Sequence, residues 1–119
     1  MKSMQKRLVD YIEDGVFPIT LWTHHNWLIT IEAKIDTGAD RSSIDIGLVE
    51  ALEFLPANKS KRVRSANGVS TRKLYRIPFC LNEEHQELVA SATDRSNMRY
   101  PMIIGRNDFL EICAIEEEE

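Results

Sequence analysis

Hydrophobic and polar residues alternate most regularly over residues 27–35. The apolar side chains on one side of this segment are Trp27, Ile29, Ile31, Ala33 and Ile35. A period of two is typical of a β-strand with one face on a core and the other in water. We therefore predict a strand here, in a sheet that packs on a hydrophobic core.

Shorter segments with similar patterns predict further strands. These lie at residues 8–12, 16–22, 61–65, 69–81, 87–93, 100–104 and 112–115. A hairpin is expected across Ala66, Asn67 and Gly68, because Asn-Gly favours the positive φ values of tight hairpin turns. A second hairpin is expected at residues 82–85. Many short strands separated by frequent turn signals indicate a small all-β barrel or sandwich.

One short helix, and a single helical turn, are expected among these strands. Asp45 can cap a helix that ends before Pro56. Its apolar stripe is predicted to be Leu48, Leu52 and Leu55. A single turn capped by Asn107 follows the strand at residues 100–104.

Composition and charge exclude several classes of protein. A chain of 119 residues with 43% hydrophobic and 29% charged residues is typical of one globular domain. No apolar run is long enough for a membrane span, so we expect no membrane contact. The net charge of −4 argues against a nucleic-acid partner.

The ends and the cysteines predict the organisation of the chain and its compartment. We expect an N-terminal arm at residues 1–15, one domain at residues 16–115 and an acidic tail at residues 116–119. No apolar stretch follows the basic N-terminus, so a cytoplasmic protein is expected. Cys80 and Cys113 lie in apolar strand patterns and are predicted to be buried free thiols.

The candidate chemistry lies directly after the clearest strand. Asp36 ends that strand and is followed by the small residues Thr37, Gly38 and Ala39, so backbone groups can approach its carboxylate. A lone Asp-Thr-Gly is a weak signal, since these residues also make ordinary turns. Its setting is more specific, because an Ile-Ile-Gly-Arg-Asn segment follows at residues 103–107.

Together these two motifs resemble those of the retropepsin-like aspartic peptidases, the retroviral protease group. Residues 18–22 are also similar to the start of retroviral proteases. The second half resembles a bacterial and archaeal branch of the same fold, labelled ATP-dependent zinc proteases. That similarity is carried by residues 34–39, 65–68 and 93–106. The resemblance implies a small closed acid-protease barrel with one or two short helices.

The resemblance also implies a site and a partner. Two carboxylates held close together can share one proton, so that one acts as base and the other as acid. The chain has one such motif, which implies a homodimer with Asp36 from each subunit at the two-fold axis. Thr37 would then bond across the dyad, and Asp40 would pair with Arg106 to support the loop. The hairpin at Ala66, Asn67 and Gly68 would be a flap over a peptide or protein substrate.

Other readings of the sequence remain open. The chain could be a non-catalytic peptide-binding or dimerisation module of the same fold, or a hydrolase of poly-glutamate or acidic C-terminal tails. No zinc-ligand or phosphate-loop motif is present, so no metal or other cofactor is expected. Asp94 and Arg95 are expected to form a structural ion pair or a turn.

Overall fold

The computed structural model describes residues 15–23, 25–65, 68–81 and 83–117, with the backbone alone for the described residues between 58 and 71. The N-terminal arm, apart from Gly15, and its expected strand at residues 8–12 lie outside these ranges. The elements in chain order are β1 (Val16–Trp22), β2 (Leu28–Asp36), β3 (Ser43–Asp45), α1 (Ile46–Leu52), β4 (Pro56–Ser65), β5 (Gly68–Leu81), β6 (Glu84–Thr93), β7 (Met102–Gly105) and α2 (Arg106–Glu117).

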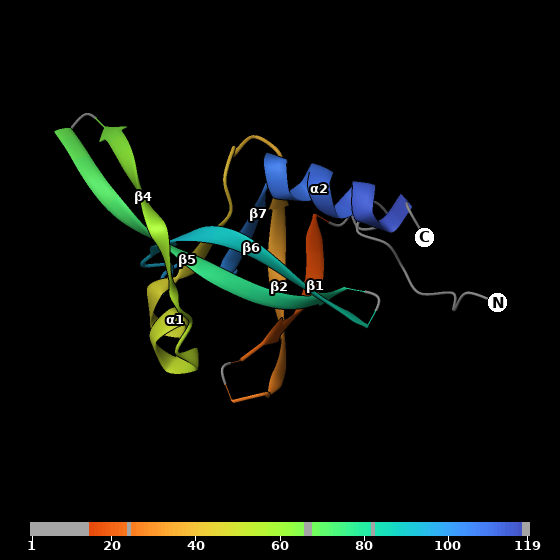
Figure 1. Cartoon of the computed structure of the whole chain (residues 1–119). Coiled ribbons are helices and arrows are strands. Elements are labelled where there is room, and N and C mark those ends of the chain that lie inside the picture. Colours follow the sequence, from red (N-terminus) through yellow and green to blue (C-terminus); the bar gives the residue numbers. More distant parts are fainter. Residues whose placement is uncertain (1–14, 24, 66–67, 82, 118–119) are drawn as a thin grey trace.

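The strands form one sheet in the order β1-β2-β7-β3-β6-β5-β4 (Figure 1). β1 pairs with β5 as well, at Thr20 with Cys80 and at Leu21 with Phe79, so the sheet closes on itself and only β4 lies outside the ring. This architecture confirms the predicted all-β class with one or two short helices, of which the structure has two in its described ranges.

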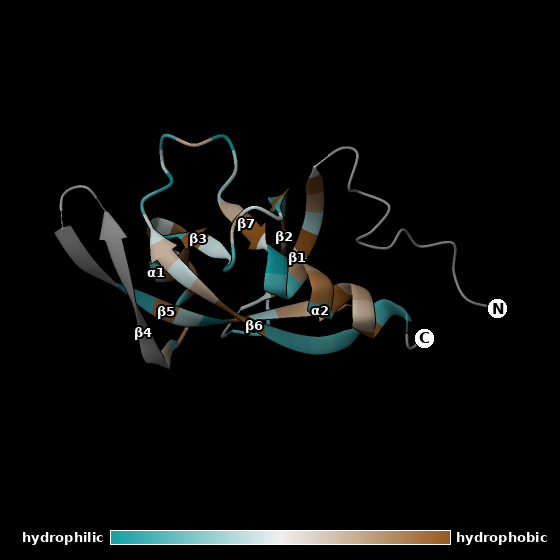
Figure 2. Ribbon diagram, turned by 90° about the horizontal axis from the view of Figure 1, so that it is seen from above, coloured by the Kyte–Doolittle hydropathy of each residue, from teal (hydrophilic) through white to brown (hydrophobic). Residues whose placement is uncertain are grey.

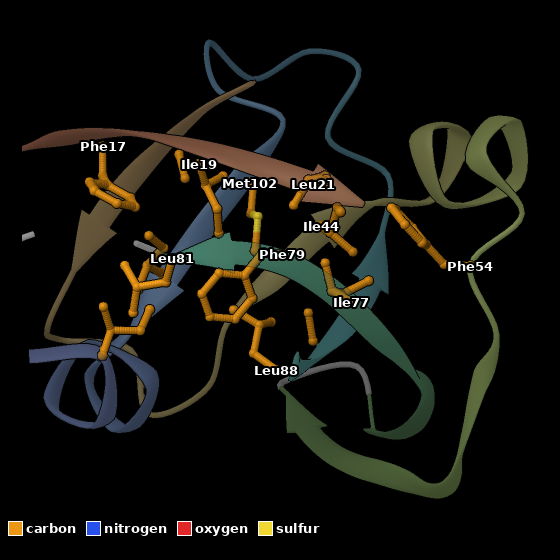
Figure 3. Close-up of a cluster of buried hydrophobic side chains, with 14 of the residues drawn as sticks. Phe17, Ile19, Leu21, Ile44, Phe54, Ile77, Phe79, Leu81, Leu88 and Met102 are labelled. Carbon is orange, nitrogen blue, oxygen red and sulfur yellow. The ribbon is translucent and has the colours of Figure 1, made fainter. Parts of the chain in front are cut away.

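The core lies inside the closed sheet. Side chains from β1 and β5 point toward one another across it, with Met102 of β7 between them (Figure 3). β1 and β7 are mostly hydrophobic along their length (Figure 2). The most deeply buried large side chains of this core are Ile19, Leu21, Ile44, Ile77, Met102 and Ile104.

The predicted apolar face of β2 is only half covered. Ala33 is fully buried and Ile35 packs against the core, but Ile29 is 36% exposed. Trp27, predicted as the first residue of this face, precedes the strand and is 68% exposed. The reason is the pairing of the sheet: β7 lies beside only the second half of β2, from Ala33 to Asp36.

The first predicted hairpin is formed by β4 and β5, which pair antiparallel up to Ser65 and Gly68. Its turn residues Ala66 and Asn67 lie outside the described ranges. β4 starts earlier than predicted, at Pro56. The second hairpin joins β5 to β6, with Glu83 in the left-handed region at φ 67°.

Helix α1 begins where the sequence predicts and ends earlier. The Asp45 carboxylate accepts a hydrogen bond from the Leu48 N–H at 3.3 Å, so it caps the helix. The helix stops at Glu53, whose backbone is left-handed, and does not reach Pro56. Consequently Leu55 leaves the predicted stripe and is 54% exposed, whereas Val49 is the buried residue of the helix.

Helix α2 replaces the single turn and final strand that the sequence predicted. Phe109, Ile112 and Cys113 recur at spacings of three and four, which places them on one helical face. Ile112 is buried and the other two pack against the core, so burial of this face selects the helix. Cys113 is a half-buried free thiol, as is Cys80 on β5, but it lies on a helix. Burial raises the pKa of the Cys113 thiol.

The last two residues of α2, Glu116 and Glu117, are the first two of the expected acidic tail. Glu116 is only 3% exposed. None of the helices in the described ranges combines the length and apolarity needed to cross a membrane.

Candidate active site

Asp36 is the last residue of β2 and is half-buried. The insertion of β7 between β2 and β3 determines its neighbourhood, because Asp36 lies beside Gly105, the last residue of β7. The Asp-Thr-Gly and Ile-Ile-Gly-Arg-Asn motifs, far apart in the sequence, therefore meet at one end of the sheet.

A tight loop follows Asp36. The Gly38 N–H donates to Asp36 Oδ1 at 3.1 Å, and the Ala39 N–H donates to the Asp36 carbonyl at 3.1 Å. A Cβ at Gly38 would lie 3.3 Å from Oδ1, which is a tight contact. Thr37 and Gly38 are exposed, so the turn presents a carboxylate and two small residues to the outside.

The loop is joined to the start of α2. The Ala39 carbonyl accepts from the Arg106 N–H at 2.7 Å, and the Asp40 carbonyl accepts from the Asn107 N–H at 3.4 Å. These are N–H groups of the first helical turn, which have no partner inside a helix. The Arg106 guanidinium also donates to Asp40 Oδ1 at 2.5 Å. The structure thus brings together Asp40 and Arg106, as the resemblance implied. Backbone and side-chain hydrogen bonds together fix the loop after Asp36 to the start of α2.

Ser42, whose role the sequence did not reveal, lies beneath this loop and is completely buried. Its hydroxyl donates to Asp108 Oδ2 at 2.6 Å and accepts from the Gly105 N–H at 2.9 Å. Gly105 is tightly enclosed here, since a Cβ would lie 2.5 Å from the Arg41 carbonyl carbon. The only sequence signal for Ser42 and Asp108 is that each lies two residues after a member of the Asp40–Arg106 pair.

The loop after β6 is held by contacts other than the expected ion pair. Asp94 accepts from the Ser96 hydroxyl at 2.6 Å and from the Ser96 N–H at 2.9 Å, and these bonds lower the pKa of Asp94. The Arg95 N–H donates to Asp45 Oδ1 at 2.8 Å. Asp94 and Arg95 therefore do not pair with each other. Of the two expected arrangements, an ion pair or a turn, the structure has the turn, in which Asp94 bonds to Ser96.

The β4–β5 hairpin, the candidate flap, projects away from the rest of the sheet (Figure 1). Of its expected tip, Gly68 is the first residue of β5. Near the base of the hairpin, Arg76 makes two hydrogen bonds to Glu87, at 2.9 and 3.0 Å. This pairing raises the pKa of Arg76.

Metal-ligating side chains do not gather at this end of the sheet. Across the described ranges, no group of three or more His, Cys, Asp or Glu side chains is placed to hold a metal ion. The reactive group that this end of the sheet presents is the Asp36 carboxylate, which is held at a turn by the Gly38 N–H.

Comparison with solved structures shows that the fold is similar to that of two retroviral proteases. EIAV protease, in complex with the inhibitor HBY-793, aligns with a TM-score of 0.57 and 13% identity over 95% of this chain and 94% of that one. Simian foamy virus protease aligns with a TM-score of 0.56 and 14% identity, over 82% of this chain and 96% of the viral protein. The fold is retropepsin-like.

A bacterial protein of known structure also aligns with this fold. It is a protein of unknown function (DUF785) from Legionella pneumophila, with a TM-score of 0.52 and 18% identity over 82% of this chain and 84% of its own. The sequence matches no family model and no curated protein. The likeness to the three solved structures is therefore one of fold.

Proposed function

We propose that this chain is an aspartic peptidase that acts as a homodimer, with Asp36 from each subunit forming the catalytic pair. The observation that carries the proposal is the position of Asp36. It is a half-buried carboxylate on a tight turn of a retropepsin-like fold, with the Gly38 N–H on one of its oxygens. Each chain supplies one such turn, so a pair of these carboxylates requires a second subunit.

The reaction that follows is water addition to a peptide bond. Two carboxylates about 3 Å apart share one proton, so one is a base and the other an acid. The base takes a proton from water as the water oxygen bonds to the peptide carbon, and the acid protonates the carbonyl oxygen. The C–N bond then breaks as the nitrogen accepts a proton, which leaves an amine and a carboxylic acid.

The remaining residues of the turn have supporting roles in this proposal. Thr37, exposed on the turn, bonds across the two-fold axis. Gly38 and Ala39 place backbone N–H groups against Asp36. The pair of Asp40 and Arg106 holds the loop on α2, and the β4–β5 hairpin closes over the peptide and excludes water.

The setting of the enzyme is also part of the proposal. Free thiols at Cys80 and Cys113 suit a reducing compartment, so we place the protein in the cytoplasm. The resemblance of the second half to the bacterial and archaeal branch adds the polar segment of Asp94 and Arg95, after β6, to the substrate site.

The test compares the unmodified chain with Asp36→Asn and with a matched carboxylate-to-amide control, Glu50→Gln, on the exposed side of α1. Each is incubated with a mixed peptide library between pH 4 and pH 7, and products are identified by mass spectrometry. We expect the control to cleave normally and Asp36→Asn to lose at least about 10³-fold in rate, as expected for a group that forms and breaks bonds. Light scattering after size exclusion is expected to show a dimer for all three.

Two outcomes would contradict the proposal. Retained cleavage by Asp36→Asn would remove Asp36 from the mechanism. A dimer that binds peptides but cleaves none of them would show the non-catalytic module that the sequence also allows.

A further inference from the structure

The sheet face that carries Asp36 has a cationic neighbour. Lys34 precedes Asp36 by two residues, so both side chains leave β2 on the same face, roughly 7 Å apart along the strand. In register, Lys34 lies beside Ile103 of β7, and Ile103 lies beside Ser43 of β3. The Lys34 side chain is exposed and makes no hydrogen bond or ion pair with the described residues. Its ammonium group is free to meet a ligand.

A second cation reaches the same row of residues from the loop after β6. Arg95 donates from Nη1 to Ser43 Oγ at 3.4 Å and from Nε to the Tyr100 carbonyl at 3.0 Å. Since neighbouring strands lie about 4.8 Å apart, Ser43 is roughly 10 Å from Lys34 across β7. Two cations thus flank Ile103. Their distance from Asp36 is about the length of three residues of a bound, extended peptide.

Arg95 is unusual in how its charge is buried. The residue is only 8% exposed, yet both acceptors of its guanidinium are neutral oxygens. The ion pairs of the described residues do not include it, and the nearby Asp45 carboxylate accepts from two backbone N–H groups instead. A buried charge is costly unless an opposite charge compensates it.

The third guanidinium nitrogen, Nη2, is the one available to an anion. Nη2 makes no hydrogen bond among the described residues, and none of the fully enclosed side-chain nitrogens there lacks a partner. Nη2 is therefore not fully enclosed and has some contact with solvent. The bonds of Nε and Nη1 hold the loop after β6 in place. The positive charge and Nη2 remain available to bind a carboxylate.

We propose that Lys34 and Arg95 form a carboxylate-binding subsite beside Asp36, so that the substrate is a peptide with an acidic residue within about three positions of the cleaved bond. This inference rests on the proposed peptidase function and names its substrate class. Arg95 supplies a positive charge and the N–H groups of Nη2 to a carboxylate, and Lys34 supplies a mobile point charge.

The distribution of charge along the chain supports an acidic peptide. Residues 54–82, which include the β4–β5 hairpin, contain seven of the 15 basic residues and none of the 19 acidic residues. The proposed flap is therefore also suited to an acidic substrate. The acidic remainder of the chain argues against a nucleic acid in this place.

The test measures binding to the full-length chain carrying Asp36→Asn, so that no cleavage is needed. The probes are two fluorescein-labelled decapeptides of alternating alanine and glutamate, or alanine and glutamine, followed by fluorescence anisotropy. We expect the glutamate peptide to bind at least roughly tenfold more tightly, as charge-assisted hydrogen bonds require. Lys34→Gln and Arg95→Gln are each expected to reduce that preference several-fold, and Lys34→Glu to reverse it.

Arg99→Gln is the matched control, because Arg99 belongs to the same loop and lies 5.5 Å from the centre of the Tyr100 ring. It removes the same charge and is expected to leave the preference unchanged. Thermal melting checks that Arg95→Gln folds, and the exposed Lys34 provides a variant that does not depend on packing.

Three results would overturn the subsite: equal binding of the two peptides, equal loss of preference in Lys34→Gln and Arg99→Gln, or tighter binding of a ten-nucleotide single-stranded DNA with the same sensitivity to Lys34 and Arg95. A glutamate preference that depends on Lys34 and Arg95, in a chain that cleaves nothing when Asp36 is present, would keep the subsite and refute the peptidase.

Discussion

The two ends of β2 are built in different ways. At its final residue, Asp36, the strand lies beside β7, and the following loop is bonded to α2. At its first residue, Leu28, the strand pairs with β1 alone among the described residues. The Leu28 side chain is 57% exposed there, and Trp27 just before it is 68% exposed.

The contacts at the two ends also differ in their distance along the chain. Around Asp36 they join residues far apart in sequence, such as Ser42 to Asp108 and Asp40 to Arg106, each 66 positions apart. The other end is a hairpin whose contacts are mostly local, such as the bond from Trp22 to Asn26 at 3.2 Å. The comparison shows that the loop of the candidate site is held by contacts between residues far apart in the sequence. A single substitution can remove such a contact.

The largest effect is expected from Gly105→Ala, at the enclosed end. The new Cβ would lie 2.5 Å from the Arg41 carbonyl carbon and 2.8 Å from the Ser42 nitrogen, so the backbone must move. We expect a loss of about 3 kcal/mol in the free energy of unfolding, measured with urea. Gly15→Ala is the control, because its Cβ meets nothing within 4 Å and only its φ of +71° is unfavourable. A loss there of about 1 kcal/mol is expected, and equal losses would contradict the enclosure of Gly105.

Ser42→Ala tests the buried hydroxyl beneath the loop. The substitution leaves the Gly105 N–H and one Asp108 oxygen without their partner. Ser42 is 0% exposed, so water does not readily replace its hydroxyl. We expect a loss of about 2 kcal/mol in unfolding free energy, together with a lower rate in the peptide-cleavage assay of the proposed function. Ser96→Ala, in the exposed loop after β6, is the control and is expected to cost far less. Equal costs would show that the hydroxyl of Ser42 is dispensable.

Arg106→Gln separates the ion pair from the backbone bonds of the same loop. The side chains of Arg106 and Asp40 are 52% and 70% exposed, so solvent screens their attraction. The cost in unfolding free energy is expected to stay below about 1 kcal/mol, and high salt is expected to reduce it further. A cost as large as that of Ser42→Ala would indicate that the pair carries more of the loop than the buried hydroxyl does.

The smallest effect is expected at the open end of β2. Leu28→Ser removes an apolar side chain that is already mostly in water, so unfolding free energy is expected to change by no more than about 0.5 kcal/mol. Ala33→Ser, on the fully buried part of the same strand, is the comparison and is expected to cost more. Similar costs in urea denaturation would contradict the difference between the two ends.

Strict alternation made β1 and β2 predictable, because a period of two appears directly in the sequence. The extent of burial on β2 was not predictable, since it depends on which four residues β7 covers. The C-terminal segment was misread for a similar reason. Ile112 to Ile115 is a short apolar run that fits a strand or a helix, and packing of Phe109, Ile112 and Cys113 on the core decides for the helix.

The candidate site was predictable only in part. The motif and its turn are local, so Asp36 and Gly38 could be singled out from the sequence. The junction between Ser42, Gly105 and Asp108 could not, because no local pattern indicates which distant backbone N–H a serine will meet. Arg95 could be singled out with Asp94, but its burial without a carboxylate partner could not be predicted, because that is a property of the folded chain.

The insertion of β7 between β2 and β3 also governs when the site can exist during protein synthesis. A ribosome that has made residues 1–100 has already made Asp36 and its turn, but not the strand that lies beside Asp36 or the helix that bonds the loop. The nascent chain at that stage therefore carries Asp36 without the strand and the helix that surround its turn. Completion of the candidate site waits until residues 101–117 have left the ribosome and entered the fold, so the timing of its assembly is a consequence of strand order.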